Sequence, residues 1–468
     1  MADKKKTEGE LLADKLLSDH KHGGLLLSDK ELKECSEFCE GYKSYLDAAK
    51  IEREAVIEAV RRAKEAGFKE FERGKKYKAG DKFYFVNRGK AVILGVMGKL
   101  DLSEGIRLAA AHIDSPRLDL KQNPLYEDME LALFKTHYYG GIKKYQWAAI
   151  PLALHGVIIK ADGESVAVNI GEDENDPVFC VTDLLPHLAQ QQMKRTPAEL
   201  IKGEELNLLV GSMPFKDDKV SKKVKLNIMR ILNEKYGIVE DDFMSAELEI
   251  VPQFKAKDIG FDRSMIGAYG QDDSACAYTA LEAILNIKKP DHTCITVLTD
   301  KEETGSDGNT GLNSSYLKYF IDDLARAYGL CGHNIISDSE CLSADVNSAV
   351  DPTFPDVTEN MNASKLNYGV VATKFTGARG KSGTSDASAE FVGRVRRLFD
   401  KNGVIWQTGE LGKVDLGGGG TVAQFIANLD MEVIDVGVPV LCMHAPFEVT
   451  AKLDIYMAYK AFSVFFAD

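Results

Sequence analysis

The chain has 468 residues, of which 44% are hydrophobic and 28% are charged, as is typical of a folded, soluble protein rather than a disordered one. Its length predicts about two or three structural units, at roughly 100–200 residues per domain. The 72 Asp and Glu outnumber the 58 Lys and Arg and give a net charge of −14. Because this charge repels phosphate backbones and anionic lipids, we expect neither a nucleic-acid nor a membrane partner.

The sequence contains no uninterrupted apolar run of about 18 residues, the length that a membrane-spanning helix needs. Its N-terminus also lacks the apolar core of a signal peptide. None of the eight cysteines forms a Cys-x-x-Cys pair, and most have apolar neighbours. Reduced, buried thiols are typical of cytosolic proteins, so we expect a cytoplasmic location.

The first elements in chain order are helical. Residues 1–27 are rich in Lys, Asp and Gly and are expected to form a loose arm, to which the sequence assigns no role. The segment Ser28-Asp-Lys-Glu31 fits a capping box, in which the Ser and Glu side chains bond to each other's backbone N–H groups. Apolar residues at helical spacing follow, and they predict one or two helices up to about Gly67.

Short apolar runs replace the helical period from Lys82 onwards, and they predict strands at 83–86, 91–96 and 106–111. The last run is apolar without interruption from Leu108 to Ala111, which is typical of a strand buried on both faces. Between 118 and 254 strand-like stretches alternate with lysine-rich polar stretches. We expect this segment to be a mainly β insertion.

Helices and strands alternate again after about Phe261, which predicts a mostly parallel sheet with helices on both faces. Helices are expected at 274–288, 311–328, 386–401 and 449–466, and strands at 293–298, 334–337, 404–408 and 439–443. The predicted fold is therefore an α/β domain that a β-rich domain interrupts. Its divisions are 1–117 for the arm, the helices and the first part of the α/β domain, 118–254 for the insertion, and 255–468 for the remainder.

Residues typical of metal sites follow several of these strands. Ligands of an open α/β sheet bind at the carboxyl ends of its strands. The residues in question are His112 and Asp114, Gln271-Asp272-Asp273, Glu302 and Glu303, Asp345, and His444. Each of them alone is more often a structural residue or a helix cap. Together, two His and several carboxylates without Cys favour zinc, manganese or cobalt, and they are close to the five or six ligands that two ions need.

The spacing of these residues predicts two local arrangements. His112 and Asp114 are two apart on an extended segment, so their side chains point to the same side and Asp114 can accept the free imidazole N–H of His112. The adjacent side chains of Glu302 and Glu303 diverge, so that one can bind a metal while the other stays free. A free carboxylate beside an activated water is a general base.

Two further features carry weaker signals. The glycines Gly417–Gly420 lack the ending of a phosphate-binding loop. A close approach of the substrate to the backbone around Gly419 and a plain turn are about equally consistent with them. The basic residues Lys374, Arg379 and Lys381 are more typical of a solvated surface than of a binding site.

The ordered motifs resemble the aspartyl aminopeptidase family of dinuclear-zinc aminopeptidases. The similar segments are Ala111-His112-Ile-Asp114-Ser-Pro, Tyr139-Gly-Gly-Ile142, Gln271-Asp272-Asp273, Glu302-Glu303-Thr-Gly-Ser, Ser343-Ala-Asp345 with Ala349-Val-Asp-Pro352, and Met443-His444-Ala-Pro. The resemblance implies a catalytic domain of zinc-exopeptidase type, interrupted by a β-rich dimerisation domain over 118–254, and assembly into a homododecamer.

The resemblance also implies roles for individual residues. Asp272 would bridge two divalent ions, zinc or else cobalt or manganese. His112 and Asp345 would complete one site, and Glu303 and His444 the other. Glu302 would be the base that activates water, and Asp114 would orient His112.

The activity that the resemblance implies is removal of the N-terminal residue from peptides with a free N-terminus. Alternatives on the same scaffold are a dipeptidase, a carboxypeptidase or a deacylase, and a non-catalytic scaffold protein is a further one. Two positions depart from eukaryotic members of the family: Asp273 stands where they usually have Asn, and Gln191 where they have a His that reaches the neighbouring subunit. The preferred N-terminal residue therefore stays open, with Lys374 as a candidate contact for an acidic one.

Overall fold

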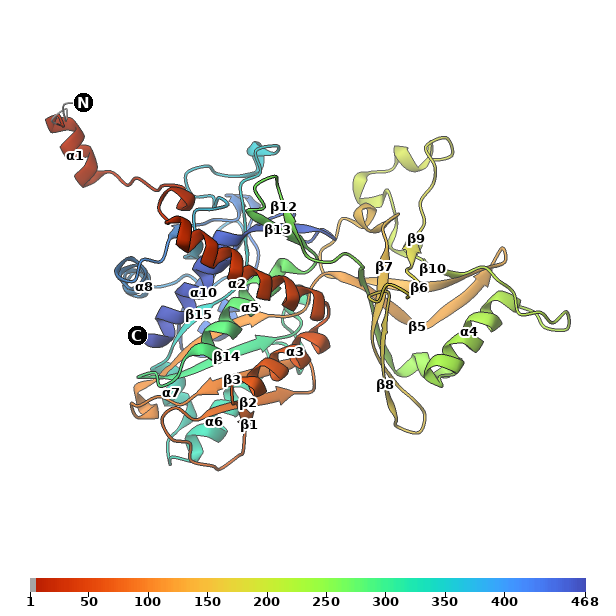
Figure 1. The fold of residues 1–468 in the computed structure, drawn as a ribbon, viewed down its shortest axis with the longest axis horizontal. Helices are drawn as coiled ribbons and strands as arrows, with labels where there is room; N and C mark the ends of the chain where they lie inside the picture. Colours follow the sequence, from red (N-terminus) through yellow and green to blue (C-terminus); the bar gives the residue numbers. More distant parts are fainter. Residues whose placement is uncertain (1–5) are drawn as a thin grey trace.

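Two sheets form the cores of two lobes in the computed structural model, which describes residues 6–468. Figure 1 shows a large lobe and, beside it, a small lobe drawn in yellow and green. The small lobe consists of the elements from Arg117 to Pro252, and the large lobe of those before and after them. The chain therefore leaves the large lobe just after His112 and returns to it shortly before Asp272.

The N-terminal region is helical, as expected from about Ser28 onwards. Helix α2 (Asp29–Ala48) begins with the predicted capping box, in which Ser28 and Glu31 each accept a backbone N–H from the other. Helix α3 (Glu52–Glu65) follows it. A shorter helix, α1 (Glu8–Leu16), lies within the expected loose arm, buries none of its residues and projects from the large lobe (Figure 1).

A nine-stranded sheet runs through the large lobe. Its four central strands β14, β4, β15 and β21 are parallel to one another, and antiparallel pairs flank them. The α/β class is confirmed. The strands in spatial order are β1 (Lys69–Glu70), β2 (Lys82–Asn87), β3 (Ala91–Val96), β14 (Thr293–Thr299), β4 (Ile106–His112), β15 (Glu340–Ser343), β21 (Glu432–Gly437), β17 (Val370–Thr373) and β18 (Trp406–Thr408).

Apolar cores cover both faces of this sheet, which is why its central strands carry unbroken apolar runs. One core joins the sheet to α2, α3, α5 (Gln271–Asn286), α8 (Ala389–Lys401) and α10 (Lys452–Ala467). The other joins it to α6 (Tyr316–Arg326), α7 (Gly332–Ser337) and α9 (Ala423–Ala427). The predicted metal-site residues lie at or after the carboxyl ends of the central strands and at the start of α5.

The strand predicted at 334–337 is wrong. These residues belong to helix α7, and the strand β15 begins only at Glu340. Ile335 and Ile336 of α7 are buried against the sheet. Because a short apolar run is compatible with either a buried strand or a buried helix, its periodicity could not separate the two.

A seven-stranded sheet forms the small lobe, and all its strand pairs are antiparallel. Helix α4 (Lys223–Tyr236) packs on it. The spatial order is β8 (Ser165–Ile170), β7 (Leu152–Ile159), β11 (Ala246–Pro252), β5 (Arg117–Asp128), β6 (Leu131–Tyr139), β10 (Leu208–Gly211) and β9 (Cys180–Val181).

A third, five-stranded sheet lies next to the metal-site residues. It contains β12 (Lys257–Ile259), β13 (Met265–Ala268), β23 (Glu448–Ala451), β22 (Pro439–Leu441) and β16 (Asn347–Ser348) in spatial order. Among the helices of residues 6–468, none is long and apolar enough to span a membrane. Within the same range, every cysteine is a free thiol.

Candidate metal centre

Five parts of the large lobe bring the predicted site residues together at one edge of its sheet. His112 is the last residue of β4, and Asp345 comes two residues after β15. Glu302 and Glu303 follow β14 in a single 3-10 turn (Glu302–Thr304). Asp272 lies at the start of α5, where its backbone angles are not yet helical, and His444 follows β22.

Asp272 lies between the two histidines. Its Oδ1 is 3.2 Å from Nε2 of His112, and its Oδ2 is 3.2 Å from Nε2 of His444. One carboxylate therefore faces two imidazoles with different oxygens. This is the arrangement that a carboxylate shared by two metal ions requires.

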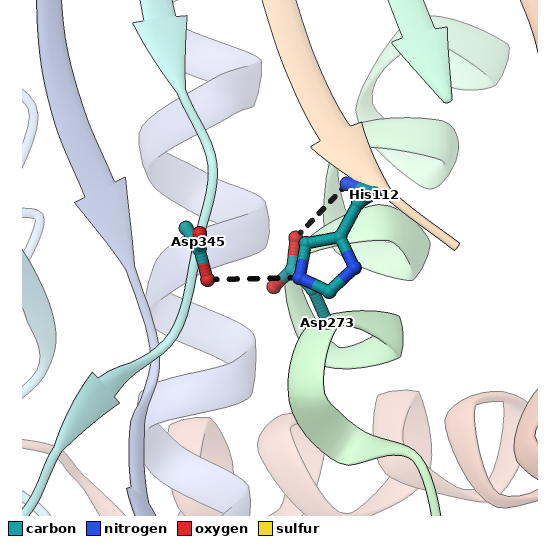
Figure 2. A group of neighbouring side chains, drawn as sticks. All are labelled: His112, Asp273 and Asp345. Carbon is teal, nitrogen blue, oxygen red and sulfur yellow. Dashed lines mark hydrogen bonds and ion pairs between the residues drawn. The ribbon is translucent and has the colours of Figure 1, made fainter. Parts of the chain in front are cut away.

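Two acidic residues complete the surroundings of His112 (Figure 2). Asp345 Oδ1 is 3.8 Å from Nε2 of His112, while Asp273 Oδ2 accepts the backbone N–H of His112 at 3.3 Å. Glu302 Oε2 also lies 3.8 Å from that Nε2. His112, Asp273 and Asp345 offer donor atoms close enough to one another to hold an ion, so Asp273 joins the group that the sequence had predicted.

The second group contains His444, Glu303 and Asp272. Glu303 Oε2 is 3.5 Å from Nε2 of His444. The other ring nitrogen of His444, Nδ1, lies 2.8 Å from the carbonyl oxygen of Gly141 and donates to it, which orients the imidazole. Since Gly141 comes two residues after β6, the small lobe contributes to the metal centre.

Asp114 lies behind the ligands rather than among them. Its carbonyl oxygen is 2.9 Å from Nδ1 of His112, and its carboxylate Oδ1 is farther away, at 3.4 Å. The same carboxylate accepts the backbone N–H groups of Glu302 and Glu303, at 3.1 and 3.2 Å. Burial opposes its ionisation, but the contacts with His112 and Tyr139 leave the pKa of Asp114 below its usual value.

The charges of this cluster fit a cation. His112 Nε2, Glu303 Oε1 and Asp273 Oδ1 are buried and make no hydrogen bond with any described residue. Buried polar atoms of native proteins normally have a partner, and adjacent buried carboxylates are costly unless a positive charge balances them. The imidazole and carboxylate donors match the preference of zinc.

Burial and the neighbouring charges also shift the pKa values of the clustered side chains. Burial raises the pKa of Glu302 to about 7. Burial opposes protonation of His444, but Asp272 and Glu303 raise its pKa to about 10. Protons thus neutralise the cluster when no other cation does, and a bound metal ion, which needs neutral imidazole and ionised carboxylates, would displace them.

Glu448 on β23 is a site residue that the sequence reasoning missed. Its Oε1 accepts the backbone N–H of His444 at 2.7 Å, and its Oε2 accepts that of Asp272 at 3.0 Å. Burial raises the pKa of Glu448 to about 8. The sequence signal is an acidic residue at the start of the short strand Glu448–Ala451, and that signal does not reveal a contact with Asp272.

A cavity of about 380 Å³ opens over the metal centre. Its lining residues besides the four carboxylates are Gly305, Val346, Asn347, Thr376, Leu411, Met443, His444 and the glycine loop Gly418–Gly420 with Thr421. Gly419, predicted as a substrate contact, lies in this lining. Lys374 does not, and its ammonium group pairs with Asp386 instead.

The fold and the site are typical of α/β metalloenzymes, whose His and carboxylate donors lie at the carboxyl edge of the sheet. The sequence profile of the family described as "Aminopeptidase I zinc metalloprotease (M18)" matches residues 45–466. The chain belongs to the M18 family.

Individual relatives are similar over almost the whole length. The probable M18 family aminopeptidase 1 of Clostridium acetobutylicum is 51% identical over 461 residues, which cover 96% of this chain and 98% of that protein. The crystal structure of the M18 aminopeptidase from Thermotoga maritima matches with a TM-score of 0.92 and 44% identity, covering 96% of this chain and 99% of the other. The mApe1 dodecamer of S. cerevisiae matches with a TM-score of 0.73 and 20% identity over 92% and 96%, a likeness of fold.

Proposed function

We propose that this protein is a zinc-dependent aminopeptidase that removes the N-terminal residue from peptides, and that the cluster around Asp272 is its active site. The observation that carries the proposal is the contact of one carboxylate with both His112 and His444. Membership of the M18 family and 51% identity to a relative named as an aminopeptidase support the activity.

The proposed ligands divide into two sets that share Asp272. His112 and Asp345 form one set, and Glu303 and His444 the other; the buried atoms without hydrogen bonds support both. Divalent ions held there, zinc first and cobalt or manganese as substitutes, supply the positive charge that polarises a carbonyl and makes water a stronger acid.

Glu302 is the proposed general base. It lines the cavity and belongs to the same turn as Glu303, and its backbone is fixed by Asp114. A carboxylate at this place can take a proton from the attacking water and deliver it to the leaving amine. Asp114 forms hydrogen bonds with both this turn and His112, so that the base and the ligand keep their relative positions.

The lining of the cavity favours aminopeptidase over carboxypeptidase activity. Four carboxylates line it, namely those of Asp272, Glu302, Glu303 and Asp345, and none of its lining residues among those described is Lys or Arg. Bound metal ions would balance the charge of the three proposed ligands among these carboxylates, but the lining still offers no cation to pair with the terminal carboxylate that a carboxypeptidase must bind.

The same lining favours a neutral first residue. Val346, Leu411 and Met443 offer apolar contacts, whereas Lys374, the candidate contact for an acidic residue, is engaged with Asp386. We therefore propose a preference for residues such as Leu or Met over Asp or Glu. A contact between Lys374 and an acidic residue stays a prediction of the sequence.

The experiment is a panel of Leu, Met, Asp and Glu fluorophore amides, with N-acetyl-Leu amide as the blocked control. Chelator-treated protein is reloaded with zinc, cobalt or manganese. We expect metal-restored cleavage of the Leu and Met substrates, at least tenfold weaker cleavage of the acidic ones, and none of the blocked one. Release of acetate from the blocked substrate, with no fluorophore released from any substrate, would favour a deacylase, and inactivity towards every substrate would contradict the proposal.

A Glu302→Gln variant tests the proposed base. We expect its zinc content to equal that of the wild type, because Glu302 is not among the proposed ligands. Its kcat should fall at least a thousandfold, since the amide cannot accept the proton. Turnover close to the wild-type value would show that another group is the base.

We also propose that residues 118–254 form a separate domain through which the chain assembles into a homododecamer. The lobe exposes Leu184, Leu185, Leu188 and Met193, at 50 to 69%, and apolar groups clustered on a surface are typical of an interface. The likeness of fold to the mApe1 dodecamer supports the same assembly.

A cytoplasmic location is proposed from the free thiols alone.

Light scattering after gel filtration tests the assembly. We expect a particle twelve times the mass of the chain for the wild type, and smaller particles for the double variant Leu185→Asp, Leu188→Asp. Leu100→Asp, at an exposed position of the large lobe, is the control and should leave the mass unchanged. A monomeric wild type would contradict the proposal.

A further inference from the structure

The carboxylate of Asp114 receives a third hydrogen bond, and it comes from the small lobe. The hydroxyl of Tyr139, the last residue of β6, donates to Asp114 Oδ2 at 2.8 Å. An ionised carboxylate is an acceptor only, so the hydroxyl must be the donor. The other donors to this carboxylate are the backbone N–H groups of Glu302 and Glu303. Asp114 therefore links the small lobe to the turn that carries the proposed base.

The ring of Tyr139 is itself held in place. The guanidinium carbon of Arg117 lies 4.0 Å from the ring centroid, within the range of a cation–π contact. Arg117 in turn pairs with Asp119 at 2.9 Å and with Glu249 at 3.1 Å. These residues lie on β5 and β11, so the sheet of the small lobe determines the direction in which the Tyr139 hydroxyl points.

The two glycines that follow Tyr139 approach the ligands closely. A Cβ atom added to Gly140 would lie 3.3 Å from Oε2 of Glu303, and one added to Gly141 would lie 3.3 Å from Nδ1 of His444. Gly140 also has a φ of 72°, a conformation that favours glycine. The segment Tyr139–Gly141 thus contacts both halves of the metal centre, through Asp114 on one side and His444 on the other.

We infer that Tyr139 is a positioning residue for the hydrolysis: its hydroxyl fixes the Asp114 carboxylate, which holds the Glu302–Glu303 turn by two hydrogen bonds and lies 3.4 Å from Nδ1 of His112. The small lobe then helps to position the residues of the metal centre, in addition to its proposed role in assembly. The expected change in kcat rests on the proposed function. The expected change in zinc affinity does not, because it can be measured without turnover.

The test compares Tyr139→Phe with Tyr138→Phe. Tyr138 is the neighbour on the same strand, is 41% exposed and contacts no residue of the metal centre in the described structure, which makes it the matched control. For Tyr139→Phe we expect kcat to fall by about tenfold or more with KM within twofold. We expect the zinc dissociation constant, measured by chelator competition, to rise about tenfold, the lower end of the effect of removing a residue that orients a ligand.

Three readouts separate positioning from a loss of structure. The unfolding temperature of the zinc-loaded protein should stay within a few degrees of the wild type. The visible absorption of the cobalt-loaded protein should change for Tyr139→Phe and not for Tyr138→Phe. In a double-mutant cycle with Asp114→Asn, the two losses of zinc affinity should not add, because both act through one carboxylate.

The inference is overturned if Tyr139→Phe matches Tyr138→Phe in zinc affinity and cobalt spectrum, or if the losses of the cycle add. A wild type that cleaves no substrate would instead contradict the proposed function. In that event the zinc affinities still decide the inference, so the two failures are distinguishable.

Discussion

Two carboxylates hold the backbone of the site residues: Asp114 accepts the N–H groups of Glu302 and Glu303, and Glu448 those of Asp272 and His444. The sequence predicted the ligand set because its members lie at or shortly after the end of a strand, or at the start of a helix, where α/β proteins place their ligands. The sequence did not predict the contacts of Glu448 and Tyr139 with the site, since each of these side chains contacts a residue more than 20 positions away. Such contacts depend on how the strands meet, and no local spacing reveals them.

Glu448→Gln provides a prediction at this scale. The carboxylate accepts one N–H from His444 and one from Asp272, whereas an amide has a single acceptor oxygen and would turn its NH₂ group towards one of these donors. We expect zinc affinity and kcat each to fall about tenfold or more. Chelator competition and initial rates measure this, with Glu390→Gln on the exposed start of α8 as the control. Unchanged zinc affinity would show that the contact does not position the ligands.

At the scale of elements, amphipathic helices and buried strands were predictable, and short apolar runs were not. The capping box at Ser28 and the strands around 83–96 agree with the local sequence, because each pattern identifies one structure. Residues 334–337 were assigned to a strand and are helical. The tertiary contacts of Ile335 and Ile336 decide between the two, and these contacts cannot be derived from four residues.

The glycine loop allows a prediction about an element. A Cβ atom added to Gly419 meets no atom within 4 Å, although the loop lines the cavity. If substrate passes over this loop, Gly419→Ala should raise KM several-fold with the unfolding temperature and kcat unchanged. Gly418→Ala is the contrast: its φ is 84° and its Cβ would lie 2.6 Å from the backbone of Ala378, so it should lower the unfolding temperature. A KM that does not change for Gly419→Ala would argue for a plain turn.

For the whole molecule, ion pairs between the lobes connect stability to pH. Lys50, between α2 and α3, pairs with Glu172 at 2.6 Å, and His155 of β7 lies 3.2 Å from the same carboxylate. Burial alone would raise the pKa of Glu172, but its contacts with His155, Lys50 and Lys255 lower it to about 2. A carboxyl whose pKa is lower in the folded state stabilises the protein above its unfolded pKa of 4.5 and loses this contribution as the pH falls towards 2.

Glu172→Gln should therefore lower the unfolding temperature at pH 7 and reduce its decrease between pH 5 and pH 3. Glu174→Gln, an exposed neighbour in the same loop, is the control and should follow the wild type. Scanning calorimetry at several pH values measures both. Parallel curves for wild type and Glu172→Gln would show that this carboxyl does not connect the stability of the lobes to pH.

The spread of the proposed ligands along the chain has a consequence for biosynthesis. His112 and His444 are separated by more than three hundred residues, and the whole small lobe lies between His112 and Asp272. At about 5–20 residues per second, a ribosome needs roughly a quarter of a minute to a minute to travel from one histidine codon to the other. During that interval a nascent chain has no complete centre, so an unfinished or prematurely terminated copy cannot hydrolyse the peptides around it.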